Sequence, residues 1–321
     1  MARTEIQNIS ALDFFSLHTQ NRRRMKNIAV IGAGTMGNGI AHTFAQFGFP
    51  VLLIDVSAEA LERGLSTIGK NLDRQVAKGQ LSEADKAATL ANIRTSTQFD
   101  QQLADRDLVV EAASERFEIK ADVFRKLDQF CKPECVLASN TSSISISRIA
   151  AVTGRPDKVI GMHFMNPVPV MKLVEIINGY STSAETSNAV HQLSLQLSKV
   201  PVVVNDYPGF VANKILMPMI NEAIITLHEG VAGVEEIDTV MKLGMAHPMG
   251  PLQLADFIGL DICLSILRVL QDGFGNPKYA PSPLLVNMVT AGHLGVKSKV
   301  GFYDYSHGTK DLIPAARFRK A

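Results

Sequence analysis

The stretch Ile28-Ala29-Val30-Ile31-Gly32-Ala33-Gly34-Thr35-Met36-Gly37 places the pattern G-x-G-x-x-G directly after a short apolar run. This order is typical of the strand, tight turn and helix that open a dinucleotide-binding unit. Gly32 permits the turn, Gly34 lets the backbone approach a pyrophosphate, and Gly37 lets the helix pack closely on the strand. Thr35-Met36 then begins the helix, whose free N–H groups favour an anion. The stretch therefore predicts a nucleotide-binding fold.

The next apolar run completes this unit and indicates which nucleotide it binds. Val51–Ile54 is expected to be the second strand, and Asp55 follows it directly. An acid that binds an adenosine ribose usually follows this motif by roughly 20 residues, and the spacing from Gly32 to Asp55 is close to that. Because a carboxylate there would repel a 2′-phosphate, the sequence favours NAD over NADP.

Short apolar runs alternate with helical patterns from Asn27 to about Val204. This alternation predicts βαβ units and a predominantly parallel sheet. The runs expected to form strands are 28–31, 51–54, 108–110, 136–138, 159–162, 173–177 and 202–204. We therefore expect an α/β Rossmann-like, NAD-binding domain over residues 25–205.

The pattern changes after Asp206-Tyr207-Pro208-Gly209, where the strand-like runs stop. Helical spacing follows, first in a long apolar helix expected from about Phe210 to His228. We therefore expect an all-α C-terminal domain over residues 206–321.

An amphipathic segment with a basic face lies between two of the expected strands, in a helical arm at about 58–91. Its apolar residues recur at helical spacing at Leu61, Leu65, Ile68, Leu72 and Val76. Its basic residues fall on the opposite face at Arg63, Lys70, Arg74 and Lys78. From the pattern alone, an ordinary solvated helix face is the simplest interpretation, because Glu62 and Asp73 dilute the charge.

The composition describes a globular protein of about two domains. Of its 321 residues, 46% are hydrophobic, and 32 basic against 31 acidic side chains leave a net charge of +1. This balance gives no electrostatic reason to expect nucleic acid or a membrane as a partner. No apolar run approaches the roughly 18 residues that span a bilayer, so we expect a soluble, cytoplasmic protein. The three cysteines cannot all pair and lack zinc-type spacing, which predicts reduced thiols and no metal site.

Residues 1–24 stand apart from these patterns. The basic run Asn21-Arg22-Arg23-Arg24 precedes an apolar run too short for a secretion signal. Glu5 and Asp13 count against an organelle transit peptide, which stays a minor alternative. We expect a disordered or mis-assigned extension before a natural start at Met25.

Polar side chains stand where buried strands end or the second domain begins. They lie in Ser139-Asn140-Thr141-Ser142-Ser143, His163-Phe164-Met165-Asn166-Pro167, Val174-Glu175-Ile176 and Val211-Ala212-Asn213-Lys214. Ligands of open α/β sheets bind outside the carboxyl ends of strands, so these positions are candidates for a site. Taken singly, each also has an ordinary structural explanation, such as a helix cap or a satisfied core histidine.

Together these side chains suit the oxidation of an alcohol by a nicotinamide. The alcohol proton needs a base, for which histidine is the usual residue, and His163 is the candidate. A carboxylate such as Glu175 would fix the tautomer of the imidazole and stabilise its protonated form. A hydrolase triad of Ser142, His163 and Glu175 fits less well, because no G-x-S-x-G elbow surrounds the serine.

The ordered motifs resemble those of the L-3-hydroxyacyl-CoA dehydrogenase family, and within it the bacterial 3-hydroxybutyryl-CoA dehydrogenases. The resemblance runs from about Met25 to Tyr305 and is carried by the glycine motif, Val109-Val110-Glu111-Ala112, the four polar segments, Asp206-Tyr207-Pro208-Gly209 and Pro248-Met249-Gly250-Pro251. It implies NAD-dependent, reversible oxidation of a short-chain (S)-3-hydroxyacyl-CoA to the 3-oxoacyl-CoA, in fatty-acid or butanoate metabolism. It also implies a C-terminal domain that forms a homodimer.

The resemblance assigns roles to individual residues. It implies that His163 is the general base, that Glu175 is its partner, and that Ser142 and Asn213 orient the substrate. It places residues at the NAD site in addition to the glycine motif and Asp55, namely Glu115, Lys120, Ser142, Asn166 and Lys297. It also implies that Lys70, Arg74 and Lys78 meet the phosphates of coenzyme A, which replaces the solvated-face interpretation. Relatives carry glycines where this chain has Ser298-Lys299-Val300, so the segment after Lys297 departs from the family pattern.

Two other functions remain open from the sequence. A dehydrogenase of free 3-hydroxyacids, such as the gulonate enzymes, shares the fold but has no need of a basic arm. A catalytically silent NAD-binding protein is the other, and the intact set of Ser142, His163, Glu175 and Asn213 argues against it.

Overall fold

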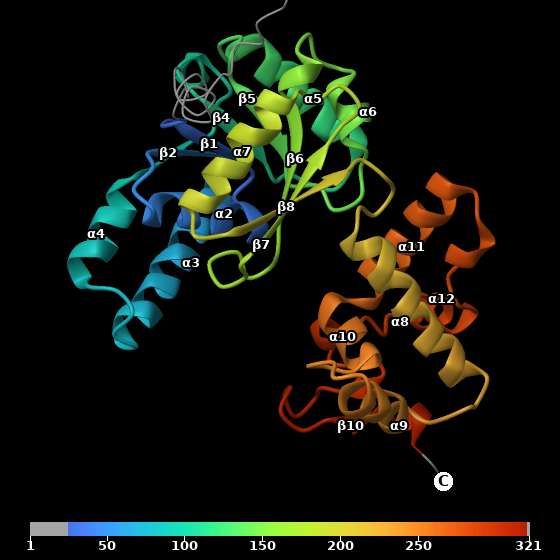
Figure 1. The fold of residues 1–321 in the computed structure, drawn as a ribbon. Helices are drawn as coiled ribbons and strands as arrows, with labels where there is room; N and C mark the ends of the chain where they lie inside the picture. The colour runs from blue at the N-terminus through green and yellow to red at the C-terminus, as the bar shows by residue number, and fades with distance from the viewer. Residues whose placement is uncertain (1–24, 320–321) are drawn as a thin grey trace, which may run out of the picture.

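One eight-stranded sheet organises the N-terminal domain, as the computed structural model of residues 25–319 shows (Figure 1). The strands are β1 (Ile28–Ile31), β2 (Val51–Ile54), β3 (Ile93–Ser96), β4 (Leu108–Glu111), β5 (Val136–Ser139), β6 (Val159–Phe164), β7 (Leu173–Asn178) and β8 (Val200–Asn205). Their order across the sheet is β3-β2-β1-β4-β5-β6-β7-β8. All neighbours are parallel except β6 and β7, which form an antiparallel pair. The predicted predominantly parallel α/β fold is confirmed.

Strand β3 is missing from the prediction, which is therefore wrong for this edge of the sheet. Its sequence Ile93-Arg94-Thr95-Ser96 has one apolar residue, and it pairs with β2 alone. Because an edge strand needs little burial, its sequence lacks the apolar run on which the other strands were recognised.

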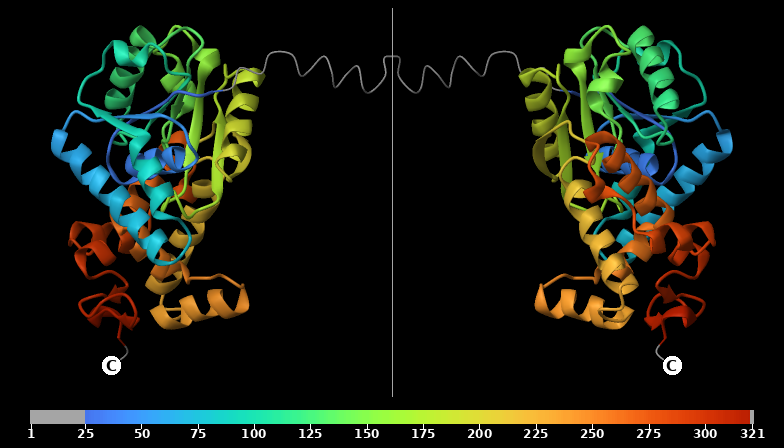
Figure 2. Two further views of the ribbon diagram at one scale, coloured as in Figure 1. Left: turned by 90° about the vertical axis from the view of Figure 1, so that its left-hand side faces the viewer. Right: turned by 90° about the vertical axis from the view of Figure 1, so that its right-hand side faces the viewer.

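Helices cover both faces of the sheet. They are α2 (Thr35–Gln46), α3 (Ala58–Ala77), α4 (Glu83–Ala91), α5 (Phe117–Phe130), α6 (Ile146–Ala150) and α7 (Ala184–Gln196). Alternate residues of β1 point to opposite faces: Ile28 and Val30 pack in one core with α2 and α7, and Ala29 and Ile31 in another with α5 and α6. Helices α3 and α4 project from the sheet as an arm (Figures 1 and 2).

The C-terminal domain is a cluster of helices with its own core (Figure 1). Its main helices are α8 (Ala212–His228), α9 (Val234–Thr239), α10 (Pro251–Ile258), α11 (Leu260–Phe274) and α12 (Pro283–Thr290), and the short strands β9 (Tyr303–Asp304) and β10 (Ile313–Pro314) follow. Helix α8 begins two residues later than predicted, because Gly209 and Phe210 have positive φ angles of 74° and 51°. Residues in that conformation cannot continue a right-handed helix.

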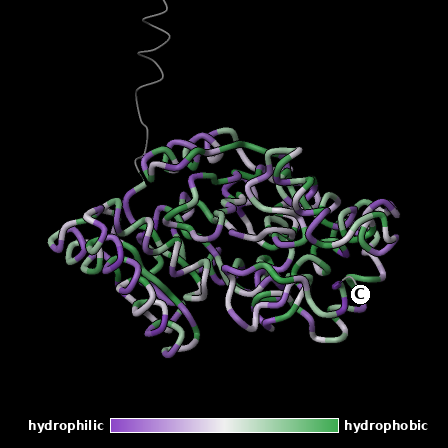
Figure 3. The backbone as a smooth tube through the Cα atoms, turned by 90° about the horizontal axis from the view of Figure 1, so that it is seen from below, coloured by the Kyte–Doolittle hydropathy of each residue, from purple (hydrophilic) through white to green (hydrophobic). Residues whose placement is uncertain are grey.

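Hydrophobic and hydrophilic stretches alternate along the backbone of both domains (Figure 3). No helix within residues 25–319 is long and apolar enough to cross a membrane. Cys131, Cys135 and Cys263 are buried and free. The predicted extension, residues 1–24, lies outside the part of the chain that the structure describes.

Candidate functional site

His163 and Glu175 face each other across the only antiparallel step in the eight-stranded sheet of the described chain. They are register partners on β6 and β7, and His163 Nδ1 lies 2.9 Å from Glu175 Oε2. Only 9% of His163 and 3% of Glu175 are exposed. A charged carboxylate can only accept a hydrogen bond, so Nδ1 carries the ring proton and Nε2 is left as the basic nitrogen.

The surroundings of Glu175 keep it charged. Burial on its own would raise the pKa of Glu175, but hydrogen bonds from His163 and from the Ala212 N–H, at 3.1 Å, hold the pKa below its usual value. Ala212 is the first residue of α8, so the C-terminal domain contributes directly to the pair. Negative charge at a helix N-terminus is favourable because the first N–H groups have no partner within the helix.

Asn213, the second residue of α8, connects this helix to the loop after β5. Its Nδ2 donates to the backbone oxygen of Ser142 at 3.0 Å, and 9% of Asn213 is exposed. The ring of Phe210 lies 6.1 Å from that of His163. The structure thus joins all four predicted catalytic residues through one short series of contacts, since Ala212 binds Glu175 and Asn213 binds Ser142.

Glu115 organises the loop that carries Ser142. Its Oε1 accepts from the Thr141 hydroxyl at 2.6 Å and from the backbone N–H groups of Ser142 and Ser143 at 3.0 and 3.1 Å. Burial would raise the pKa of Glu115, but the nearby Lys120 charge and these hydrogen bonds lower it. Glu115 therefore stays an anion and fixes the backbone on both sides of Ser142.

A buried ion pair that sequence reasoning missed lies beneath Glu115. Lys120 Nζ is 2.8 Å from Glu111 Oε1 and 3.2 Å from Glu115 Oε2, and neither Lys120 nor Glu111 is more than 1% exposed. Ser139 donates to the other oxygen of Glu111 at 2.6 Å. The available signal was a glutamate that ends the apolar strand 108–111, where burial requires a partner.

The glycine loop has the space and the donors that a dinucleotide needs. Gly32 has φ +98° and a Cβ there would lie 2.6 Å from a backbone oxygen, and a Cβ on Gly37 would lie 1.7 Å from the oxygen of Gly32. Around Gly34, by contrast, nothing lies within 4 Å of a Cβ position. Helix α2 begins there without a side-chain cap or an acidic residue in its first turn, so its N–H groups are open to an anion.

Asp55 stands beside this loop at the end of β2. Its Oδ2 accepts from the Ala33 N–H at 2.7 Å and its Oδ1 from the Ser57 N–H at 3.0 Å. Each carboxylate oxygen has a second lone pair, so the ribose hydroxyls can still donate to it. The residues present therefore fit NAD.

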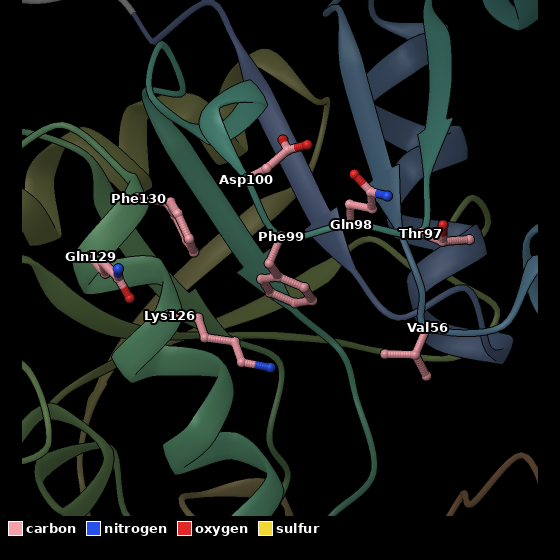
Figure 4. Close-up of a pocket in the computed structure, with 8 residues that line it drawn as sticks. All are labelled: Val56, Thr97, Gln98, Phe99, Asp100, Lys126, Gln129 and Phe130. Carbon is pink, nitrogen blue, oxygen red and sulfur yellow. The ribbon is translucent and has the colours of Figure 1, made fainter.

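A hollow of about 560 Å³ adjoins the end of β2 without containing a predicted site residue (Figure 4). It is lined by Val56, Thr97, Gln98, Phe99, Asp100, Lys126, Gln129 and Phe130. Lys126 Nζ lies 5.4 Å from the centre of the Phe99 ring, a cation–π contact between two residues that line the hollow.

The remaining predicted residues lie apart from this cluster. Lys297 belongs to the C-terminal domain and pairs with Asp261 at 2.5 Å. Lys70 and Arg74 are exposed on α3, and Lys78 is exposed directly after its end. Arg74 donates to Asn71 of the same helix at 3.2 Å. Asn166 is exposed two residues after the end of β6. The structure leaves the roles of these residues as predictions.

Comparison with known proteins identifies the family. Residues 27–207 match the NAD binding domain of 3-hydroxyacyl-CoA dehydrogenase, and residues 209–305 match its C-terminal domain. The chain belongs to the 3-hydroxyacyl-CoA dehydrogenase family.

Several members of this family are similar to the chain over most of its length. It is 54% identical over 281 residues to the 3-hydroxybutyryl-CoA dehydrogenase of Bradyrhizobium diazoefficiens, which covers 88% of this chain and 96% of that protein. It is 42% identical over 292 residues to the human mitochondrial hydroxyacyl-coenzyme A dehydrogenase, covering 88% and 91%. The crystal structure of the (S)-3-hydroxybutyryl-CoA dehydrogenase of Ralstonia eutropha superposes with a TM-score of 0.86 at 50% identity, covering 88% and 99%.

Proposed function

We propose that this chain catalyses the NAD-dependent, reversible oxidation of (S)-3-hydroxybutyryl-CoA to acetoacetyl-CoA. The observation that carries the proposal is the His163–Glu175 pair, which leaves one imidazole nitrogen free as a base. The family and the names of the similar proteins supply the substrate class.

In this proposal the protein supplies a base, an orientation and an electrostatic environment. His163 Nε2 takes the proton of the 3-hydroxyl group during oxidation and returns it during reduction. The glycine loop and Asp55 would hold NAD+, which would supply the hydride acceptor for carbon 3 of the substrate. Glu175 holds the imidazole and stabilises its protonated form, and Ser142 and Asn213 orient the substrate oxygen. We assign to the cofactor the residues Gly32, Gly34, Gly37, Asp55, Glu115, Lys120, Asn166 and Lys297.

Outside the catalytic cluster, we assign the exposed cations Lys70, Arg74 and Lys78 to the phosphates of coenzyme A. Residues 25–205 and 206–321 are proposed as the two domains, and the cytoplasm as the location. A homodimer through the C-terminal domain is supported by apolar side chains exposed there: Leu243 is 82% exposed and Met245 is 60% exposed. A second copy covering these side chains would remove them from water.

A spectrophotometric assay tests the activity. Acetoacetyl-CoA and NADH should be consumed together by the wild-type chain, and His163→Gln should lose most of that activity. A free 3-hydroxyacid oxidised faster than the thioester would favour the gulonate-type function instead. NADH binding without turnover of either substrate would indicate a silent NAD-binding protein.

A further inference from the structure

The loop between β6 and β7, residues 165–172, is here called the hairpin loop. It joins the two strands that carry His163 and Glu175, and it begins with the segment that contains Asn166. A shift of this loop therefore acts on the ends of both strands and on a predicted cofactor contact at the same time.

The hairpin loop is folded around its own carbonyl groups. The N–H groups of Val170 and Met171 both donate to the Pro167 oxygen, at 3.0 and 2.9 Å. The oxygens of Val168 and Met171 accept instead from the side chain of Lys199, whose Nζ lies 2.5 and 2.8 Å away. Lys199 lies between α7 and β8, far from the loop in sequence.

Lys199 is an uncommon kind of buried charge. It is 6% exposed, and no ion pair within residues 25–319 includes its ammonium. Burial lowers the pKa of Lys199, since charge is costly away from water. Its partners are two backbone oxygens. Burial of the charge therefore lowers the stability of the fold, and the effect of the side chain that remains is to fix the hairpin loop.

The other side of the hairpin loop rests on the cofactor-binding helix. A Cβ on Gly39 of α2 would lie 3.0 Å from Cβ and 3.1 Å from Cγ2 of Val168. Val168 is 1% exposed and belongs to the core that contains β1 and α2. The loop is thus held between Lys199 and the helix whose N-terminus lies at Gly34.

We infer that Lys199 is a positioning residue: its ammonium holds the hairpin loop, and so fixes where the His163–Glu175 pair stands relative to helix α2. This inference rests on the proposed function. Without the ammonium, the buried carbonyl group of Val168 and the part-buried carbonyl group of Met171 lose this donor, and the loop must shift for the Val168 oxygen to find another. A displacement of about 1 Å at reacting groups can cost on the order of 10²-fold in rate.

Lys199→Met tests the inference, because it keeps the length of the side chain and removes the charge. We expect kcat to fall by about 10- to 100-fold and KM for NADH to rise, while KM for acetoacetyl-CoA stays within about twofold. Lys172→Met is the matched control, since it removes an exposed lysine from the same loop and should leave all three constants unchanged. A lysine that only supports folding would instead lower Tm and leave kcat and both KM values in place, which would overturn the inference.

Gly39→Ala keeps the test decisive if Lys199→Met fails to fold. It leaves Lys199 intact and displaces Val168 from the opposite side, so it should reproduce the higher KM for NADH and the lower kcat. Wild-type kinetics in Gly39→Ala would overturn the inference.

A binding measurement separates this inference from the proposed function. The dissociation constant of NADH, followed by its fluorescence, needs no turnover. If the wild-type chain binds NADH but does not reduce acetoacetyl-CoA, the proposed function fails while the inference is still judged by NADH binding. An equal dissociation constant for wild type and Lys199→Met would overturn the inference alone.

Discussion

Glu175 in the N-terminal domain and Asp256 in the C-terminal domain are both buried carboxylates that tie separate segments together, and their chemistry differs. Glu175 binds His163, a group that can become charged. The pKa of Glu175 lies below its usual value. Asp256 accepts from the N–H groups of Phe302 and Tyr303 at 3.0 Å and from the Tyr305 hydroxyl at 3.1 Å. Burial raises the pKa of Asp256 to about 7.

The difference follows from the partners. Donors to Asp256 are neutral, and the charge of Asp238 adds to the cost of its ionisation. Its role is architectural, because a Cβ on Gly301 would lie 1.9 Å from Asp256 Oδ1, so the carboxylate occupies the space against that backbone. A buried carboxylate is therefore a candidate for catalysis where its partner can exchange a proton, and a structural element where its partners cannot.

The largest expected effect is the loss of activity in His163→Gln, about 10²- to 10⁴-fold in kcat. Glu175→Gln should approach the same loss for a geometric reason. The amide oxygen would face the Ala212 N–H, so the amide nitrogen would donate to Nδ1 and move the ring proton to Nε2. The base would then be blocked. Steady-state reduction of acetoacetyl-CoA measures both variants.

The double variant shows whether the two residues act as one unit. If they do, Glu175→Gln in the His163→Gln background should add little to the loss. If the loss of the double variant equals the product of the two single losses, Glu175 acts independently of the imidazole. That result would contradict the proposed difference between Glu175 and Asp256.

The second expected effect concerns Asp256 and stability. Its folded pKa of about 7 lies above the ordinary value of 3.8, so the folded state holds a proton that the unfolded state has released between these values. This contribution is complete below about pH 3.8 and is lost as the pH rises through 7. Between pH 5 and pH 8 the wild-type chain should lose about 3 kcal/mol relative to Asp256→Asn.

Tyrosine fluorescence can follow this unfolding, because the sequence has no tryptophan and Tyr279, Tyr303 and Tyr305 are buried in the C-terminal core. Asp272→Asn, an exposed aspartate on α11, is the control for a change of charge. Parallel pH profiles for wild type and Asp256→Asn would show that Asp256 stays charged.

Local sequence patterns were sufficient for much of the N-terminal domain. Strand β1, the glycine turn and Asp55 are recognisable because each requirement, an apolar run, a positive φ or an acid after a strand, concerns neighbouring residues. Strand β3 was missed because Ile93 is its single apolar residue.

The contacts that support the candidate site could not be predicted from such local patterns. Lys199 was not recognised, because its partners Val168 and Met171 are backbone carbonyl groups, which any residue could supply. Glu111 and Lys120 form a buried pair only after strand β4 and helix α5 pack together. Pairing across the fold depends on tertiary packing, and no periodicity in the sequence reports it.

Asp55 extends the comparison to a half-buried carboxylate whose expected partner is a cofactor hydroxyl. Losing a charge-assisted hydrogen bond costs about 1.5–3 kcal/mol, so kcat/KM for NADH should exceed that for NADPH by at least about 10- to 100-fold. Asp55→Asn should narrow this ratio, and Asp100→Asn in the neighbouring hollow should not (Figure 4). Equal efficiency of the wild-type chain with both cofactors would contradict the assignment.

The smallest expected effect tests charges that have no buried partner at all. Replacing Lys70, Arg74 and Lys78 with alanine should raise KM for acetoacetyl-CoA by about tenfold, since exposed ion pairs contribute roughly 0.2–1 kcal/mol each. The same variant should leave KM for an acetoacetyl pantetheine thioester unchanged, because that substrate lacks the nucleotide phosphates.

A charge-matched variant makes the test of the arm specific. Replacing the exposed cations Arg125, Lys278 and Lys310, which lie on other segments than α3, removes the same charge and should leave KM for both thioesters unchanged. Added salt should weaken coenzyme A binding by the wild-type chain and have less effect on the arm variant, because exposed charges are screened over about 10 Å at 0.1 M. An equal loss for both thioesters would show that the arm acts through the fold of α3 rather than through phosphate contacts. In that case the exposed cations of the arm would have no role in binding, and the arm would contribute only to the structure of the sheet domain.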